Sequence, residues 1–312
     1  MTACNPIRIA AALSRFLLFY GLVAGLLGPK LKVEAEVDNQ EQPPLRFGAI
    51  ADCQYCDADS PRRKYRLSPA KLQECIADFN SQELSHVVHL GDFIDRDWKS
   101  FDVVAPIMDE SKAPVRHVLG NHDFSVEDRY KDRVPGRLGL ESRYYSFIVG
   151  QWRFIVLDSN DVSLYAYPKG SRKYNESLNT YQSLGANLPK YNGGVGETQL
   201  NWLENELSEA GKIGQRAILH SHHPVYPPGS HVVWNAEEVI SLLEKHESVT
   251  AYINGHNHRG AYGFKKGVHY ITLKGMVDTE ETAYSVISIY EDRIEVKGKG
   301  RQDDLLLEIR KP

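Results

Sequence analysis

Acidic, amide and imidazole side chains recur in short motifs between Asp52 and His258, and these residue types can bind two metal ions that promote phosphoester hydrolysis. Such hydrolysis needs an activated water and positive charge near the phosphoryl oxygens, and two divalent cations about 3.5–4 Å apart supply both. Each motif alone is weakly specific, whereas the ordered set rarely arises by chance. In chain order the motifs are Asp52-Cys53-Gln54, Gly91-Asp92-Phe93-Ile94-Asp95, Gly120-Asn121-His122-Asp123, Tyr191-Asn192-Gly193-Gly194, His222-His223-Pro224 and Gly255-His256-Asn257-His258.

Asp92 is the natural candidate for a carboxylate shared by both cations, because its ionised oxygens offset part of their mutual repulsion. Gly91 before it allows a tight turn at a strand end. Taken alone, Asp92 could equally be a solvated turn residue, and only the accompanying motifs favour the metal. Asp52 and Gln54 are two residues apart, so extended backbone would place both side chains on one side, where Asp52 binds the first metal and Gln54 adds its amide oxygen.

His256 and His258 repeat this spacing after Gly255, which permits a sharp turn. Neutral imidazole is the commonest nitrogen ligand for metals. A lone histidine is more often structural, but this alternating pair after a glycine and a hydrophobic run favours metal binding. Asn121 offers a side-chain oxygen to the second metal.

His122 follows Asn121 directly and is predicted to face the substrate, with Asp123 placed to orient it. A histidine beside two cations resists protonation unless a carboxylate compensates, which gives Asp123 an electrostatic use. We therefore predict that His122 stabilises the developing negative charge and protonates the leaving oxygen, with His122 and Asp123 as the catalytic residues.

The motifs follow predicted β-strands, at the ends where an open α/β sheet presents its ligands. Several of these strands are followed by helical patterns. Ser68 is predicted to cap a helix with Pro69 in its first turn, and two other helices cover 198–210 and 237–246. The predicted strands are 47–51, 86–90, 115–119, 144–149, 153–157, 216–220, 249–253, 269–273, 284–290 and 293–298, of which the last three suggest a closing antiparallel section.

Size and composition allow a large core in a chain of 312 residues with 42% hydrophobic residues. The motifs run on after Arg46 without an obvious linker, which favours one catalytic domain over 46–312. The net charge is −4 and the pI about 6.3, so no broad cationic surface is expected to bind nucleic acid or anionic membranes. Nothing in the sequence indicates the oligomeric state.

The N-terminal segment 1–28 resembles a signal peptide, because arginines precede the apolar run Phe16 to Gly28. That run is shorter than the ~20 residues of a spanning helix, so no stable membrane span is predicted. Residues 29–45 would then form a linker, and the protein would be exported to the periplasm or the extracellular space. The alternatives are an anchored form, or a cytoplasmic protein in which the segment is no signal.

The cysteines add little, since Cys53 and Cys56 form one Cys-x-x-Cys without the second pair that a zinc site needs. A redox role beside the metal ligands is one interpretation. Small buried side chains at a strand end are the interpretation that we favour. Cys4 falls in the predicted signal and Cys75 on the helix that begins near Ser68.

The motif set resembles the calcineurin-like metallophosphoesterase superfamily from Phe47 to the C-terminus. The resemblance implies an α/β fold, a two-sheet β-sandwich flanked by helices. It also selects His222 over its neighbours His220 and His223, which spacing alone leaves open. By resemblance, one metal takes Asp52, Gln54, Asp92 and His258, and the other takes Asp92, Asn121, His222 and His256.

Gln54 departs from the histidine that most members carry, and an amide oxygen shifts metal preference from zinc towards manganese or ferrous iron. One branch shares this departure, the manganese-dependent ADP-ribose/CDP-alcohol diphosphatases. The chain also resembles that branch in segments that include 47–55, 62–66, 191–194 and 297–301. The resemblance implies two divalent ions, Mn²⁺ first with Fe²⁺ or Zn²⁺ as alternatives, and hydrolysis of ADP-ribose or CDP-alcohols such as CDP-choline to a nucleoside monophosphate and a phosphorylated alcohol or sugar.

The substrate contacts follow from side-chain chemistry. Arg62, Arg63 and Arg66 could bind the diphosphate through their guanidinium groups, or form a solvated basic face. Trp234 and the tyrosines of a long irregular segment, 166–194, could stack on a base or simply pack, and that segment is a candidate substrate lid. A phosphomonoesterase or cyclic-nucleotide phosphodiesterase would share every metal ligand, and a non-catalytic binding module would have lost some of them.

Overall fold

The computed structural model describes residues 43–184 and 188–309 and contains two six-stranded mixed sheets in that part of the chain. The first sheet has the order β12-β11-β10-β1-β2-β3 and the second the order β4-β5-β6-β7-β9-β8. The strands are β1 Leu45–Ile50, β2 Val87–His89, β3 Val115–His117, β4 Tyr145–Val149, β5 Trp152–Val156, β6 Arg216–His220, β7 Val249–Asn254, β8 Arg259–Lys265, β9 Val268–Lys274, β10 Ala283–Ile289, β11 Arg293–Gly300 and β12 Leu305–Glu308.

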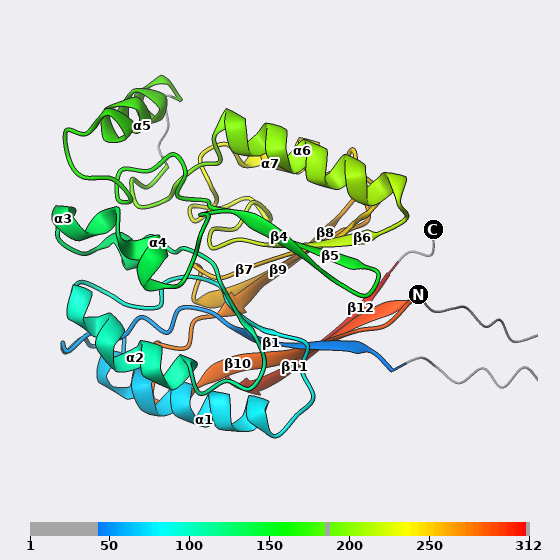
Figure 1. Cartoon of the computed structure of the whole chain (residues 1–312), viewed down its shortest axis with the longest axis horizontal. Coiled ribbons are helices and arrows are strands. Elements are labelled where there is room, and N and C mark those ends of the chain that lie inside the picture. The colour runs from blue at the N-terminus through cyan, green and yellow to red at the C-terminus, as the bar shows by residue number, and fades with distance from the viewer. Residues whose placement is uncertain (1–42, 185–187, 310–312) are drawn as a thin grey trace, which may run out of the picture. The chain divides into compact units, whose positions relative to one another are not determined.

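Helices cover the outer face of each sheet, as Figure 1 shows, with α1 and α2 on the first sheet and α6 and α7 on the second. Each pair contributes its apolar side to a separate buried cluster with the sheet that it covers. The predicted two-sheet α/β sandwich flanked by helices is thus confirmed. The helices are α1 Ser68–Asn80, α2 Phe101–Met108, α3 Asp128–Lys131, α4 Val134–Arg137, α5 Arg172–Ser183, α6 Glu197–Lys212 and α7 Ala236–Leu243.

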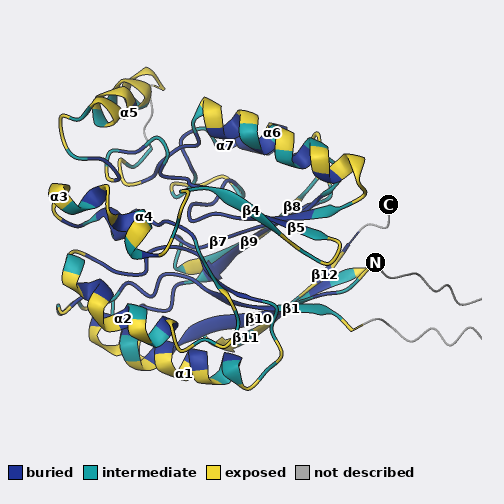
Figure 2. Ribbon diagram, viewed as in Figure 1, coloured by how far each residue is buried: buried dark blue, intermediate teal, exposed yellow. Residues whose placement is uncertain are grey.

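The central core lies between the two sheets, where both contribute inward-facing side chains. Phe47 from β1 packs edge-on against Phe154 from β5, with ring centroids 5.6 Å apart. Strands β7 and β9 are buried along nearly their whole length, because one face meets the other sheet and the other face meets helices (Figure 2). Strands that are buried on both faces have nearly continuous apolar sequences, which explains why β7 and β9 could be predicted.

Two sets of parallel strands bring the polar motifs together. In the first sheet β1, β2 and β3 are parallel, and in the second β5, β6, β7 and β9 are parallel. Loops that leave parallel strands at their carboxyl ends emerge on the same edge of the sheet. The first three motifs follow β1, β2 and β3, whereas the histidine motifs follow β6 and β7.

The structure differs from the sequence predictions at four elements. Segment 166–194 contains helix α5, which Ser171 caps by accepting a hydrogen bond from the Tyr174 amide, so this segment is not irregular throughout. Strand β9 pairs in parallel with β7, and only β10 and β11 belong to an antiparallel section with β12. Strand β8 was missed because Gly260 and Gly263 interrupt its alternating pattern. Ser68 does not cap α1, and its hydroxyl donates instead to the Cys53 carbonyl at 2.5 Å.

Buried His86 should make the fold sensitive to acid. Its ring is 1% exposed, stacks on Phe47, and has a pKa lowered to about 3 by burial and by Arg116. In the unfolded chain the pKa of this histidine is near 6.5, so below that pH the unfolded chain binds more protons than the folded protein. The stability that the neutral ring contributes is therefore fully present above pH ~6.5 and declines as the pH falls.

We expect wild-type protein to lose about 2 kcal/mol more unfolding free energy than His86→Phe between pH 7.5 and 5.0. Phenylalanine keeps the stacking and cannot titrate, so the difference between the two proteins reports the effect of protonating His86 on the unfolding free energy. Urea titrations of both metal-free proteins at the two pH values measure the difference. Equal losses in the two proteins would contradict the assignment.

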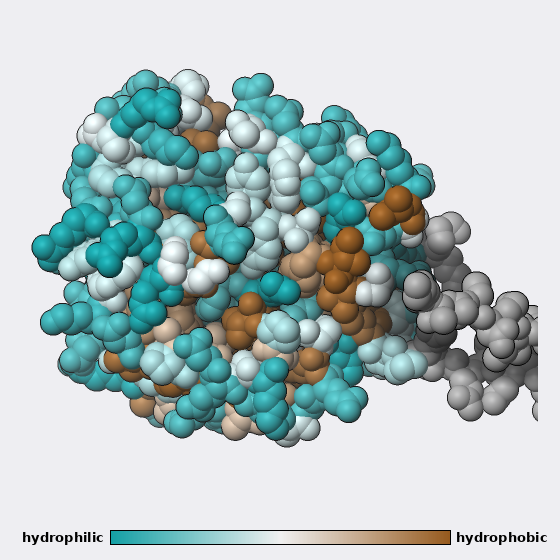
Figure 3. Space-filling model, in the orientation of Figure 1, coloured by the Kyte–Doolittle hydropathy of each residue, from teal (hydrophilic) through white to brown (hydrophobic). Residues whose placement is uncertain are grey.

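The predicted signal segment 1–28, Cys4 and most of the predicted linker 29–45 lie outside the described residues, and β1 already begins at Leu45. Within the described part of the chain, none of the helices has the length and apolar character needed to cross a bilayer. On the face shown in Figure 3 the surface is mostly hydrophilic, with hydrophobic residues in small separate groups.

Candidate active site

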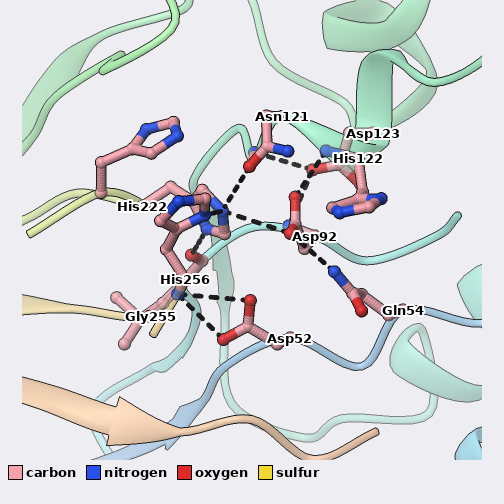
Figure 4. A network of polar contacts seen from close by, with 12 residues as sticks. Asp52, Gln54, Asp92, Asn121, His122, Asp123, His222, Gly255 and His256 are labelled. Atoms are coloured by element: carbon pink, nitrogen blue, oxygen red, sulfur yellow. Dashed lines mark hydrogen bonds and ion pairs between the residues drawn. The ribbon is translucent and has the colours of Figure 1, made fainter. Parts of the chain in front are cut away.

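Three predicted ligands converge on the Nε2 atom of a fourth, His222. This atom lies 3.3 Å from Asp92 Oδ2, 3.1 Å from Asn121 Oδ1 and 3.2 Å from His256 Nδ1. Figure 4 shows Asp92 between Gln54 on one side and His222 with Asn121 on the other. These are the oxygen and nitrogen donors that a borderline divalent cation takes, and they come from four different loops.

A second group adjoins the first through Asp92. His258 Nε2 lies 3.4 Å from Asp52 Oδ1, and Gln54 Nε2 donates to Asp92 Oδ2 at 2.8 Å. Asp52 also accepts the backbone amide of His256. The Oε1 atom of Gln54 is buried and has no hydrogen-bond partner, so this acceptor is available to a cation.

In His222, His256 and His258, the ring nitrogen that faces away from the other proposed ligands already has a polar partner. His222 Nδ1 lies 2.8 Å from the Leu90 carbonyl, His256 Nε2 lies 3.1 Å from Asn192 Oδ1, and His258 Nδ1 lies 2.9 Å from Asp278 Oδ1. Such contacts fix the tautomer and aim the remaining nitrogen at a metal. The residues present therefore fit a metal centre. They also give the Tyr191-Asn192 motif a role in orienting a ligand, and the sequence offered no sign of the role of Asp278.

Backbone strain is concentrated at the same residues. Asp52, Gln54, Asp92 and His256 all have left-handed backbone, with φ of 53°, 47°, 55° and 67°. Non-glycine residues adopt this conformation at a cost of about 1–3 kcal/mol, and it gathers at functional sites. Gly120 is required nearby, because a Cβ there would lie 2.1 Å from the backbone nitrogen of Asp92.

The buried carboxylates of the site favour the binding of positive charge. Burial lowers the pKa of His222 and His258, but the neighbouring carboxylates Asp92 and Asp52 outweigh it and raise both to about 9. The pKa of Asp92 lies well below its usual range, because His222 and His122 outweigh its burial. The carboxylates thus attract protons where cations are lacking, and metal binding must release them.

His122 is held by Asp95 and not by Asp123, which corrects the sequence prediction. Its Nδ1 lies 2.8 Å from Asp95 Oδ1, while its Nε2 lies 3.3 Å from Arg63 Nη1. Tyr65 donates to the other oxygen of Asp95 at 2.8 Å. Although burial raises the pKa of Asp95, these hydrogen bonds lower it overall, so Asp95 is ionised at neutral pH.

Asp123 instead organises the loops that carry the ligands. Its carboxylate is fully buried and accepts the backbone amides of Asp92, Phe93, Ile94 and Gly120 at 2.8–3.2 Å. These contacts join the loop after β2 to the loop after β3. Asp123 therefore has a structural role, and its side chain does not contact His122.

His223 has a different environment from His222. Its Nδ1 lies 2.7 Å from Ser159 Oγ, and its ring centroid is 4.2 Å from that of His256. Together, His222, His223 and His256 form a group able to hold a metal, as do Asp52, Asp92 and His222. Only His222 belongs to both groups, in agreement with its selection over His223. His220 lies within β6 and is buried.

Two connected pockets open from the ligands. The inner lobe, about 390 Å³, is lined by Gln54, Asp92, Asn121, His122, Tyr165 and Tyr191. The outer lobe, about 640 Å³, is lined by Gly229, Ser230, Asn257, Arg259 and Asp278. Both lobes share Arg62, Arg63, His231, His256 and His258.

Two of the predicted substrate contacts lie away from these lobes. Arg66 is exposed and pairs with Asp57 and Asp59, because its side chain points along the surface. Trp234 is 6% exposed, and its indole donates to the Pro189 carbonyl at 3.2 Å. Arg62 and Arg63 do line the lobes, whereas Trp234 packs and Arg66 forms surface ion pairs.

The sequence profile of calcineurin-like phosphoesterases matches residues 45–260 of this chain. The chain belongs to the calcineurin-like phosphoesterase family. Members of this family are hydrolases that act on phosphate esters, so the chain is a hydrolase of that class.

Relatives of this phosphoesterase align over nearly their full length. A human protein named manganese-dependent ADP-ribose/CDP-alcohol diphosphatase is 30% identical over 330 residues, covering 89% of this chain and 96% of the human protein. A protein of the same name from Arabidopsis thaliana is 31% identical over 300 residues, covering 83% and 96%. A crystal structure described as a dimetal phosphatase from Danio rerio superposes with a TM-score of 0.78 at 29% identity, covering 86% of this chain and 100% of that one.

The three cysteines in the described part of the phosphoesterase are buried. Cys53 and Cys56 are both buried and unpaired, and Cys75 is likewise a free buried thiol on α1. Burial raises the pKa of the first two to about 12 and about 11, so neither is a thiolate at neutral pH. Thiols of this kind react slowly, which favours the packing interpretation over a redox role.

Proposed function

We propose that this phosphoesterase hydrolyses the diphosphate of nucleoside diphosphate-linked substrates, with ADP-ribose and CDP-alcohols as the substrate class. The observation that carries the proposal is the pair of lobes that share His256 and His258 of the proposed ligands. A diphosphate placed at that junction has room for a group on each side. The names of the full-length relatives support the same class.

Two Mn²⁺ ions complete the proposed centre. One would be held by Asp52, Gln54, Asp92 and His258, and the other by Asp92, Asn121, His222 and His256. When bound, the ions supply a nucleophile from water and stabilise charge on the phosphoryl oxygens. The hard amide oxygen of Gln54 favours manganese over zinc at the first position.

The chain itself supplies proton transfer and further positive charge. His122 would face the leaving oxygen, and Asp95 holds its Nδ1 so that Nε2 points towards the substrate. Arg63 lies beside that nitrogen and lines both lobes, so its guanidinium can bind a phosphoryl oxygen. Asp123 keeps the ligand loops in register throughout.

A comparison of substrates tests the function. With Mn²⁺ present, we expect ADP-ribose to give AMP and ribose 5-phosphate, and CDP-alcohols to give CMP and a phosphorylated alcohol. Hydrolysis rates are to be compared with a phosphomonoester and a cyclic nucleotide, with products identified by mass spectrometry. Preference for the monoester or the cyclic nucleotide would preserve the metal site and overturn the substrate class.

A further inference from the structure

We propose that the outer lobe selects substrates by the charge of their non-nucleoside group, accepting neutral or anionic groups and disfavouring cationic ones such as choline. This inference rests on the proposed diphosphatase function. It narrows the substrate class to nucleoside diphosphates whose second group is an uncharged or acidic alcohol or sugar.

The outer lobe carries two uncompensated arginines. Arg62 and Arg259 line it, are exposed, and have no carboxylate partner among the residues that the structure describes. Arg63, which like Arg62 lines both lobes, differs because its Nη1 lies 3.5 Å from Asp95 Oδ2. The free positive charge of the outer lobe therefore comes from Arg62 and Arg259.

The carboxylates near the outer lobe already have hydrogen-bond or ion-pair partners. Asp278, the acidic residue of its lining, lies 2.9 Å from His258 Nδ1, and its side chain is 14% exposed. Asp57 and Asp59 pair with Arg66 outside the lobe. A cationic group entering the lobe would thus meet two arginines without a free carboxylate to offset them.

The two lobes also differ in aromatic character. Tyr165 and Tyr191 border the inner lobe, and the Tyr191 ring centroid lies 5.6 Å from that of His256. Exposed aromatic rings suit a planar base. The outer lobe has no Trp, Tyr or Phe in its described lining, so it lacks the aromatic cage by which proteins bind quaternary ammonium groups. The nucleoside therefore fits the inner lobe and the other group the outer lobe.

CDP-choline and CDP-glycerol test this directly, because they share the nucleotide and differ in the charge of the alcohol. With full-length protein and Mn²⁺ at low ionic strength, we expect kcat/KM for CDP-glycerol to exceed that for CDP-choline by about fivefold or more. Added salt should reduce the ratio, because exposed charges are screened.

Charge reversal identifies the residue responsible. R259E should bring the ratio of the two kcat/KM values to within about twofold, and R259Q should give an intermediate ratio. K212E provides a matched control, because Lys212 is exposed at the end of α6, outside both lobes. This variant should retain the wild-type ratio.

The outcomes separate the two proposals. Equal kcat/KM for both substrates, or a preference for CDP-choline, would overturn the charge selection while leaving the diphosphatase function intact. A ratio that R259E leaves unchanged would overturn the role of the outer lobe. If neither compound is hydrolysed but a phosphomonoester is, the diphosphatase function itself fails, and with it this inference.

Discussion

Replacing His122 by alanine should lower kcat by about 10²–10⁴-fold, the range typical of a lost general acid. The imidazole is 2.8 Å from Asp95 through Nδ1 and is not one of the proposed ligands. The metal loops should survive the change, because the contact of residue 122 to Asp92 Oδ1 is made by its backbone amide at 2.7 Å. Manganese content should therefore remain that of wild type.

Two measurements made together decide this prediction, the turnover of ADP-ribose and the bound manganese per chain. Asp95→Asn is the companion variant, because it keeps the shape and removes the charge that holds the imidazole. We expect its kcat to fall less than that of His122→Ala, again with full metal content. Loss of manganese in parallel with activity would show that His122 is a ligand, contrary to the assignment.

Replacing Asp92 by alanine should lower both activity and metal binding. Its Oδ2 is 3.3 Å from His222 Nε2 and accepts from Gln54, so this carboxylate joins the two ligand groups. Loss of this carboxylate should weaken metal binding at both proposed positions. Because metal ions contribute several kcal/mol to charge stabilisation, we expect at least about a 10³-fold loss in kcat/KM.

The control for this prediction is Asp59→Asn, which removes an exposed carboxylate that pairs with Arg66. It should keep wild-type activity and manganese content. Equilibrium dialysis against Mn²⁺ for wild type and both variants measures binding. An Asp92→Ala protein that still binds two ions tightly would refute the bridging role, even if its activity were low.

Much of the ligand arrangement could be predicted because it depends on local features. Asp52, Asp92 and His256 follow apolar strands, and Gly91 and Gly255 mark the turns directly before the last two. The carboxyl ends of parallel strands then bring together residues that are far apart in sequence. His222 was the exception, since its choice over His223 needed a family resemblance and its environment became apparent only in the fold.

The partner of His122 could not be predicted from proximity in sequence. Residues 122–124 form a 3-10 turn, in which successive side chains point in different directions, so His122 faces outward while Asp123 turns inward to the backbone amides. Asp95, 27 residues earlier, reaches the imidazole through the tertiary fold. The contact of Asp278 with His258 likewise spans 20 residues and has no local signature.

The proposed substrate contacts were the least predictable, because their positions depend on surface side-chain directions. Arg62, Arg63 and Arg66 form one basic run in sequence, yet Arg66 turns to Asp57 while the other two line the lobes. Arg259 follows the proposed ligand His258 directly and could not be predicted, since a single arginine on a glycine-containing strand is not a distinctive signal.

Titration of metal-free protein with Mn²⁺, following bound metal and ADP-ribose hydrolysis together, tests whether two bound ions are needed for diphosphate hydrolysis. We expect two ions per chain, little hydrolysis before the sites fill, and AMP as the nucleotide product. Full activity without bound metal, or binding of two ions without hydrolysis of any diphosphate substrate, would contradict it.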